Sequence, residues 1–190
     1  LTEAEAAQIG ARGTAQRQAD RQLGRVAAKR ALSLLTGHAP STFEILNEQS
    51  GRPVVRGDDG PKVSISHRAG EAVAVATSSG HPGIDLEIVQ ERPASFAQTW
   101  FRPEERAWSQ GVPRRESQIW AIKEAVLKSL GTGMALSPVD IEVLEVCGDT
   151  AQVVLWGDAR MRHLAMGGGE LKISLEAHGE MVVAVAWMAS

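Results

Sequence analysis

The 190-residue sequence predicts an α+β fold of two similar α/β lobes related by a pseudo-twofold axis. Two observations support this: helical and strand-like segments alternate, and the segments of the first half recur in the same order in the second. A chain of this length forms one ordinary domain, or two small lobes that share a core. We expect one lobe over residues 1–82, another over 83–190, and a functional site between them.

The first half begins with helical sequence and continues with strands. Thr2 and Glu5 have the spacing of a capping box, in which a hydroxyl and a carboxylate bond the first free amides of a helix. The run 12–35 is rich in helix-forming Ala, Arg, Gln and Leu, and Gly37 is a natural stop. Strands are expected at 43–46, 52–55, 63–66 and 72–76.

The second half opens with a strand. Residues 80–83 predict a turn, and 83–88 alternate apolar and acidic residues, which is the period of a half-buried strand. The glycine-rich stretch 157–170 is expected to be a loop. The remaining pattern predicts helices at 103–109 and 116–130, then strands at 139–146, 151–156, 171–176 and 181–188.

An internal repeat connects the two halves. A shift of 110 residues places 63–65 on 173–175 and 73–76 on 183–186. A shift of 94 places Lys29 on Lys123, and a shift of 98 places the strand at 43–46 on the strand at 141–144. Because these matches keep their order along the chain, they favour a duplicated lobe. The alternative is two unrelated hairpins of generic strand composition.

Composition excludes several classes of function. The net charge is −3, with 20 basic and 23 acidic side chains, so a general nucleic-acid-binding surface is not expected. The single cysteine excludes an internal disulfide and a cysteine-rich metal site. No segment has the ~20 consecutive apolar residues of a membrane helix. We therefore expect a cytoplasmic protein that contacts neither nucleic acid nor membrane.

Two pairs of side chains could carry chemistry. Asp85 and Glu87 point to the same strand face, about 6–7 Å apart, and such hard oxygen ligands suit Mg²⁺. Glu124 and Lys128 share a helix face one turn after Trp120, which favours partial burial of the carboxylate. The alternatives are a solvated strand face for the first pair and a surface salt bridge for the second.

A basic group lies upstream of these pairs. Arg17, Arg21 and Arg25 form one ridge on the first helix, and His67 ends a predicted strand. Arginine forks match phosphate oxygens, so the ridge could bind an anion. The alternatives are a solvated helix face and a histidine without functional contacts.

Combined in this order, these segments resemble the 4′-phosphopantetheinyl transferases of the Sfp type. The paired signature is Gly-Ile-Asp-Leu-Glu at 83–87 and Trp-Ala-Ile-Lys-Glu-Ala-Val-Leu-Lys at 120–128, closed by Gly-Thr-Gly at 131–133. Four shorter pieces also resemble family segments: Gly24-Arg25, Gly51-Arg52-Pro53, Ser64-Ile65-Ser66-His67 and Phe101-Arg102-Pro103-Glu104-Glu105.

The resemblance implies transfer of the phosphopantetheine arm of coenzyme A to a serine of an acyl or peptidyl carrier protein, with release of 3′,5′-ADP. Asp85, Glu87 and Glu124 would hold Mg²⁺ on the pyrophosphate. Glu124 would also be the base for the serine hydroxyl, directly or through water. Lys128 would bind the α-phosphate side of the pyrophosphate, so that Asp85, Glu124 and Lys128 carry the catalysis.

The resemblance also implies a set of residues that bind coenzyme A. His67, with Arg21 or Arg25, would bind the 3′-phosphate, and Arg52 would lie near the adenine and that phosphate. Ser66 belongs to the same Ser-x-Ser-His segment as His67. Glu105 matches a family glutamate close to the metal or the pantetheine arm.

Other functions remain open from the sequence. The chain could be a non-catalytic module that binds coenzyme A or a carrier, a Mg²⁺-dependent nucleotide hydrolase, or a structural interaction module. The chain begins at Leu1 without the leading strand that the family normally has, so we expect a domain excised from a polyketide or fatty-acid synthase. A monomer is expected, or a higher oligomer within such a synthase.

Overall fold

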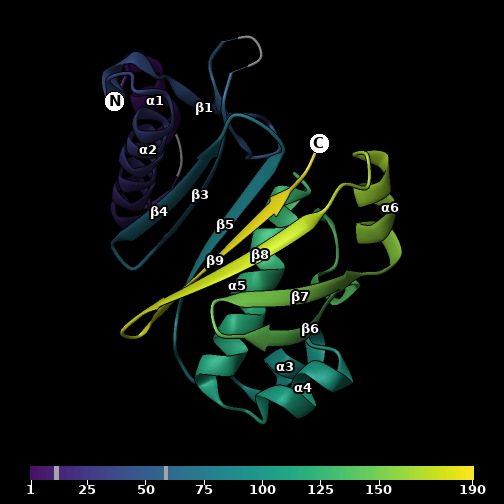
Figure 1. Ribbon diagram of the computed structural model, residues 1–190. Coiled ribbons are helices and arrows are strands. Elements are labelled where there is room, and N and C mark those ends of the chain that lie inside the picture. The colour runs from purple at the N-terminus through teal and green to yellow at the C-terminus, as the bar shows by residue number, and fades with distance from the viewer. Residues whose placement is uncertain (11–12, 58–59) are drawn as a thin grey trace.

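The computed structural model describes residues 1–10, 13–57 and 60–190. Residue 12, where the long helical run is expected to begin, lies outside the described residues. In the first half two helices precede two hairpins (Figure 1). These elements are α1 (Glu3–Gly10), α2 (Ala15–Thr36), a short 3-10 turn η1 (Pro40–Thr42), β1 (Ile45–Asn47), β2 (Pro53–Val55), β3 (Lys62–Arg68) and β4 (Glu71–Thr77).

The second half begins with a strand and continues with three helices. Two further hairpins complete the second half, and one more helix lies between these two hairpins. The elements are β5 (His81–Ile88), α3 (Ala94–Trp100), α4 (Pro103–Ser109), α5 (Pro113–Ser129), η2 (Gly133–Ala135), η3 (Pro138–Asp140), β6 (Ile141–Cys147), β7 (Thr150–Leu155), α6 (Gly157–Ala165), β8 (Leu171–His178) and β9 (Met181–Met188).

Two local expectations are wrong. The stretch 157–170 is not all loop, because its first nine residues form α6. Ala, Arg, Met and Leu are good helix formers, and the glycine run begins only after that helix has ended. The turn expected at 80–83 is confined to Gly80 and the residues before it, since His81 and Pro82 already pair with Met188 and Trp187 of β9. The lobe boundary expected after residue 82 therefore falls inside β5.

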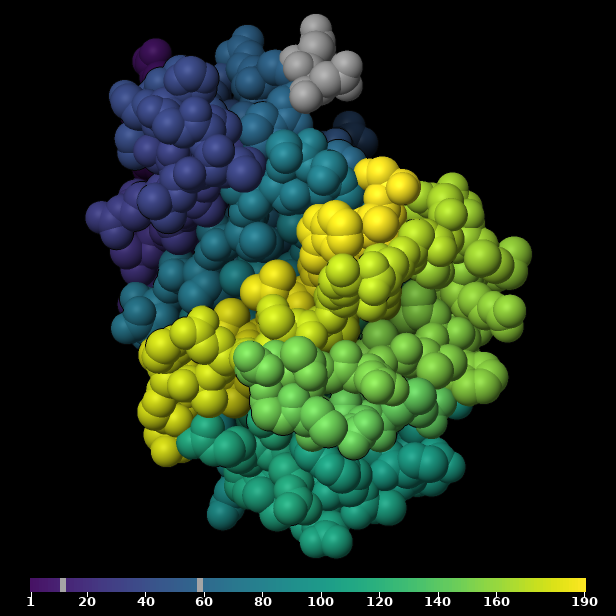
Figure 2. Space-filling model, viewed as in Figure 1, coloured from purple at the N-terminus to yellow at the C-terminus, as the bar shows by residue number. Residues whose placement is uncertain are grey.

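The strands form two hairpins and one larger sheet. β1 pairs with β2 and β3 with β4, while the second half forms a five-stranded antiparallel sheet in the order β5-β9-β8-β7-β6. Helix α2 lies along the β3–β4 hairpin, and α5 lies behind the larger sheet (Figure 1). In Figure 2 the C-terminal strands, in yellow, run between the purple and blue first half and the green remainder. None of the described helices is long and apolar enough to cross a membrane.

The element order confirms the repeat. In each half a short helix precedes a long helix, and two hairpins follow: α1-α2-β1β2-β3β4 corresponds to α4-α5-β6β7-β8β9. Each long helix buries an apolar stripe against its own hairpins. In the first half Ala28 and Leu32 pack with Phe43, Ile45 and Val63. In the second half the apolar residues of α5 pack against β6, β8 and β9, with members such as Ile119, Ile122, Val126, Ile141, Ala184 and Met188.

A glycine allows β5 to lie directly on α5. A Cβ atom at Gly83 would stand 1.9 Å from the carbonyl oxygen of Ala125 and 2.6 Å from the amide nitrogen of Ser129. Both atoms belong to helix backbone and cannot rotate away. The strand and the helix can therefore approach this closely only because residue 83 has no side chain.

We predict that Gly83→Ala lowers the free energy of unfolding by at least about 2 kcal/mol, because the added methyl group forces two backbone segments apart. Urea unfolding followed by circular dichroism measures this change. Gly10→Ala is the matched control: its Cβ would meet no atom within 4 Å, and its effect should stay within about 1 kcal/mol. Equal effects of the two substitutions would contradict the packing argument.

Candidate active site

The packing of β5 on α5 brings together three of the predicted side chains. Lys128 of α5 donates from Nζ to Asp85 Oδ1 at 2.7 Å and to the carbonyl oxygen of Ile84 at 2.9 Å. Glu124 lies one helical turn before Lys128, and the charge of Asp85 shifts its pKa. The structure thus places Asp85, Glu124 and Lys128 in one cluster, as the resemblance implies.

Asp85 is 5% exposed, and its two carboxylate oxygens differ. Oδ1 accepts hydrogen bonds from Lys128 and from the hydroxyl of Ser66, the latter at 2.9 Å. Oδ2 is buried and has no hydrogen-bond partner in the part of the chain that the structure describes. A buried anionic oxygen without a partner is costly, so it indicates a place for a cation.

Glu124 is half-buried beside two other carboxylates. Desolvation raises the pKa of Glu124 to about 7, with further raising by the charges of Asp85 and Glu87, while Lys128 opposes the shift. A carboxylate in this state exchanges a proton near neutral pH, which suits a general base.

Trp120, one turn earlier on α5, packs edge-on against Phe96 of α3, with ring centroids 4.9 Å apart.

Glu87 is buried but already bound by two arginines. Its Oε1 accepts from Arg68 at 3.0 Å and its Oε2 from Arg92 at 2.7 Å. Burial and the charge of Asp85 raise the pKa of Glu87, while both arginines oppose the shift. Within residues 1–10, 13–57 and 60–190, no three His, Cys, Asp or Glu side chains are grouped so as to hold a metal ion. The metal-binding role of Glu87 stays a prediction.

The strand β3 of the first half is tied to β5 by alternate side chains. Ser64 Oγ accepts from the amide of Ile84 at 3.1 Å, Ser66 donates to Asp85, and Arg68 binds Glu87. The resemblance assigns Ser66 to the cofactor, but its hydroxyl donates to the Asp85 carboxylate in this structure. Sequence reasoning did not identify Arg68 or Arg92, because only the folded pairing places them at Glu87.

A pocket of about 510 Å³ lies between α1, α2, β3 and the β1–β2 hairpin, and Arg21, Arg25 and His67 line it. The buried Arg25 donates to the Asn47 side chain, and its Nε has no hydrogen-bond partner among the described residues. Partial burial lowers the pKa of His67; Lys128 and Arg21 lower it further, and Asp20 opposes them. Two guanidinium groups and an imidazole facing one pocket fit an anionic ligand.

A second cavity of about 220 Å³ lies beside this pocket and reaches Lys128. Its lining includes Arg52, Ser64, Lys128 and the glycine-containing segment 131–133. The two cavities share Gly51, Pro53 and Ile65, and are therefore neighbours. The predicted basic residues and Lys128 thus line two neighbouring cavities, and the ion pair of Lys128 with Asp85 joins the second cavity to the carboxylate cluster.

Glu105 has a different surrounding from the one the resemblance implies. It is 1% exposed and pairs with Lys123 Nζ at 2.9 Å. Its oxygens also accept from the amides of Arg102 at 2.7 Å and Val143 at 2.8 Å. Because protein donors inside the second half occupy both oxygens, Glu105 supports the fold at this position, and no contact in the structure supports its cofactor-binding role.

Glu124 gives a pH-dependent prediction. Its pKa is higher in the folded protein than the ordinary value of 4.5, so the folded state loses stability as pH rises from about 4.5 to 7. In metal-free buffer at pH 8, Glu124→Gln should raise the free energy of unfolding by about 1–3 kcal/mol. This gain should vanish near pH 4.5, where wild type is protonated too.

Urea denaturation at both pH values measures this difference. Exposed Glu104 of α4 provides the control, since Glu104→Gln should change stability by no more than ~0.5 kcal/mol at either pH. A stabilisation by Glu124→Gln that is the same at both pH values would contradict the assignment.

Comparisons with curated proteins identify relatives of this chain. It is 32% identical over 120 residues to fatty acid synthase subunit alpha of Saccharomyces cerevisiae, covering 57% of the chain and 6% of that protein. It is 33% identical over 89 residues to the 4′-phosphopantetheinyl transferase gsp of Aneurinibacillus migulanus, covering 44% and 36%. The chain therefore spans only a minor part of these curated relatives.

Solved structures agree with the fold. The holo-ACP-synthase of Plasmodium yoelii aligns with a TM-score of 0.51 and 25% identity, over 59% of this chain and 95% of that one. A P. yoelii acyl carrier protein synthase with ADP bound aligns with the same TM-score and identity. The sequence model of the 4′-phosphopantetheinyl transferase superfamily matches residues 82–186, which include β5 and α5 with their acidic cluster. Since that match covers more than half of the sequence, the chain belongs to the 4′-phosphopantetheinyl transferase superfamily.

Proposed function

We propose that the chain transfers the 4′-phosphopantetheine group of coenzyme A to a serine of an acyl or peptidyl carrier protein, and that it requires Mg²⁺ and releases 3′,5′-ADP. One observation carries the proposal: Lys128, which pairs with Asp85 and lies one helical turn after Glu124, lines a cavity that adjoins a pocket lined by two arginines and a histidine. Coenzyme A needs both features, because its phosphates need cations and its acceptor needs a base.

Asp85 and Glu124 fit a magnesium ion, which usually takes only one or two protein carboxylates. Asp85 has a buried oxygen without a described partner, and Glu124 adds a carboxylate whose pKa is raised by burial and by the charges of Asp85 and Glu87. Such oxygen donors are those that Mg²⁺ prefers. Asp85, Glu87 and Glu124 would hold the ion, and Glu87 would do so by releasing Arg68 or Arg92. When bound, Mg²⁺ supplies positive charge that opposes the growth of negative charge on the leaving phosphate.

Two side chains of the protein, Glu124 and Lys128, would carry out the proton transfer and stabilise the leaving group. Glu124 accepts the proton of the serine hydroxyl, directly or through water, as the oxygen bonds to the phosphorus that carries pantetheine. The bond from that phosphorus to the bridging oxygen breaks, and 3′,5′-ADP leaves with this oxygen. Lys128 faces the pyrophosphate and balances the charge that collects on the leaving group. The pKa of Glu124 is about 7 without a metal ion, and a bound Mg²⁺ would lower it and so favour the ionised form that accepts the proton.

The basic pocket would hold the nucleotide end of coenzyme A. His67 and Arg25, with Arg21 beside them, face one pocket and would bind the 3′-phosphate. Arg52 lines the adjoining cavity, near the adenine in this arrangement. Binding of the remote nucleotide would orient the reacting phosphate beside Lys128, which is how an enzyme uses distant contacts to lower a reaction barrier.

The similarity to fatty acid synthase subunits supports a carrier of the fatty-acid or polyketide type. It also fits the hypothesis that this transferase is part of a synthase. Carrier choice depends on complementary charge and shape at the docking surface.

The reaction class is tested by mass spectrometry of an apo-carrier protein incubated with the chain, coenzyme A and Mg²⁺. We expect a gain of ~340 Da on one serine, since the group is transferred with one phosphate. Glu124→Gln should slow labelling by on the order of 10²-fold or more, because the serine proton loses its acceptor. Coenzyme A binding without any mass gain would indicate a non-catalytic module, and phosphate release from ATP would indicate a hydrolase.

Magnesium dependence is tested separately with Asp85→Asn. We expect loss of Mn²⁺ binding, measured by electron paramagnetic resonance, and turnover lowered by on the order of 10²-fold or more. The exposed Asp149, in the turn between β6 and β7, provides the control, because Asp149→Asn leaves the cluster unchanged. Turnover of wild type that is unaffected by a chelator would contradict the metal roles.

A further inference from the structure

Each half of the molecule contains a buried carboxylate with the same three partners. In the first half Glu5 of α1 pairs with Lys29 of α2 at 2.7 Å. Its oxygens also accept from the amide of Thr2 at 2.7 Å, which caps α1, and from the amide of Ile45 at 2.8 Å, which begins β1. One fully buried side chain therefore joins the short helix, the long helix and the first strand.

The second half repeats this arrangement contact for contact. Glu105 of α4 pairs with Lys123 of α5, caps α4 through the amide of Arg102, and accepts from the amide of Val143 in β6. The repeat found in the sequence already places Lys29 on Lys123 and Ile45 on Val143. Lys123 is further enclosed, because its Nζ also donates to the carbonyl oxygens of Pro138 and Ile141.

Such a buried pair specifies geometry more than it adds stability. The cost of desolvating two charges offsets much of their attraction, but a carboxylate with three fixed donors tolerates only one arrangement of the elements that supply them. In each half, one side chain therefore connects the long helix with the cap of the short helix and with the first strand of the hairpin.

The two long helices carry different parts of the proposed site. Lys29 lies one turn after Arg25, and α2 brings Arg21 and Arg25 to the basic pocket. Lys123 directly precedes Glu124, and α5 brings Glu124 and Lys128 to the carboxylate cluster. Displacement of α2 would therefore disturb nucleotide binding, whereas displacement of α5 would disturb the reacting groups.

We propose that Glu5–Lys29 and Glu105–Lys123 are equivalent positioning pairs, the first for the half of the site that binds the nucleotide and the second for the half that performs transfer. This inference rests on the proposed function and adds four positioning residues to it. None of the four contacts substrate in the arrangement described above.

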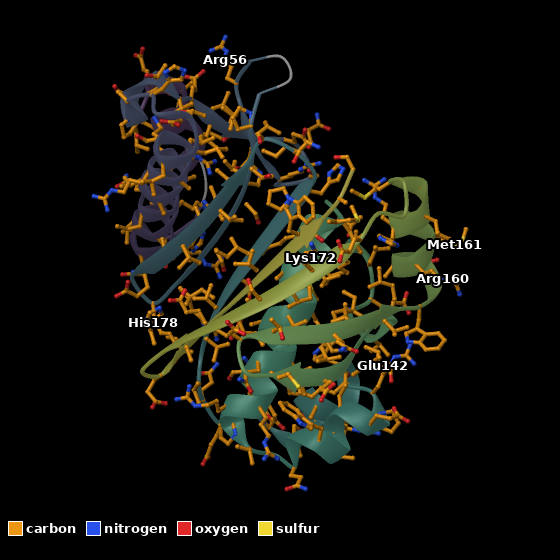
Figure 3. All side chains as sticks on the ribbon, viewed as in Figure 1. Arg56, Glu142, Arg160, Met161, Lys172 and His178 are labelled. Atoms are coloured by element: carbon orange, nitrogen blue, oxygen red, sulfur yellow. The ribbon has the colours of Figure 1, made fainter. Side chains whose placement is uncertain are left out.

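The test replaces each pair by uncharged side chains of similar shape. Glu5→Gln/Lys29→Met and Glu105→Gln/Lys123→Met keep an oxygen that accepts the strand amide, while they remove both buried charges together so that neither remains unpaired. The exposed pair Glu170–Lys172, 3.1 Å apart, provides the matched control, and Lys172 is labelled in Figure 3. Glu170→Gln/Lys172→Met should behave as wild type.

The expected result is a crossed pattern. The first variant should raise KM for coenzyme A and Kd for 3′,5′-ADP about 10-fold, with kcat within about 3-fold of wild type. The second should lower kcat about 10-fold and weaken Mn²⁺ binding, with Kd for 3′,5′-ADP within about 3-fold of wild type. Urea unfolding of each variant gives its stability, so that all binding measurements are made where each is folded.

Two results would overturn the proposal. One is that both variants change KM and kcat alike, in proportion to lost stability, which is what a merely structural role predicts. The other is that neither binding constant changes in either folded variant. Failure of the proposed function has a different signature, because wild type would then transfer no phosphopantetheine to the carrier. Binding of 3′,5′-ADP would still measure the state of the first half, and binding of Mn²⁺ that of the second. If wild type binds neither probe, both proposals fail together.

Discussion

The site depends on the contact between β5 and α5 at Gly83. Asp85 follows two residues later on the strand, and Lys128 lies on the helix between the two backbone atoms that a side chain at 83 would strike, those of Ala125 and Ser129. The same closeness that forbids a Cβ brings a carboxylate to a lysine at 2.7 Å. A wider spacing between strand and helix would leave Asp85, Glu124 and Lys128 as ordinary surface charges, each solvated separately.

Electrostatic repulsion within this cluster explains its other partners. Burial and neighbouring carboxylate charges raise the pKa of Glu87 and of Glu124, and Lys128, Arg68 and Arg92 oppose these shifts. The compensation is incomplete at Asp85 Oδ2 and at Glu124, whose pKa stands near 7. In the proposed function, Asp85 Oδ2 would bind the divalent cation and Glu124 would accept the proton.

The cluster of Asp85, Glu124 and Lys128 follows only from the resemblance to the family, since its members lie on a strand and a helix that are distant along the chain. The sequence predicts the repeat and most of the element order, because those depend on periodicity, but it misses helix α3. It does not predict α6, since the glycines that follow that helix suggested a loop for the whole stretch. It also does not predict the contacts of Glu105, whose place near the metal or the pantetheine arm was implied only by the resemblance. That residue's partners come from β6, α5 and the cap of α4, and a contact among segments separated along the chain leaves no pattern in any one of them.

Duplication then explains why one scaffold can serve two tasks. Both halves share the buried Glu–Lys pair, which fixes a long helix against its hairpin, so the surface residues of that helix can differ without loss of the arrangement. The position equivalent to Glu124 in the first half is Arg30, and the equivalent of His67 in the second half is Ala177. With their frameworks held alike, the first half lines the larger pocket with arginines and a histidine, while the second half carries the carboxylates near Lys128. A phosphate-rich substrate that must also meet a base and a metal ion requires that combination of charges.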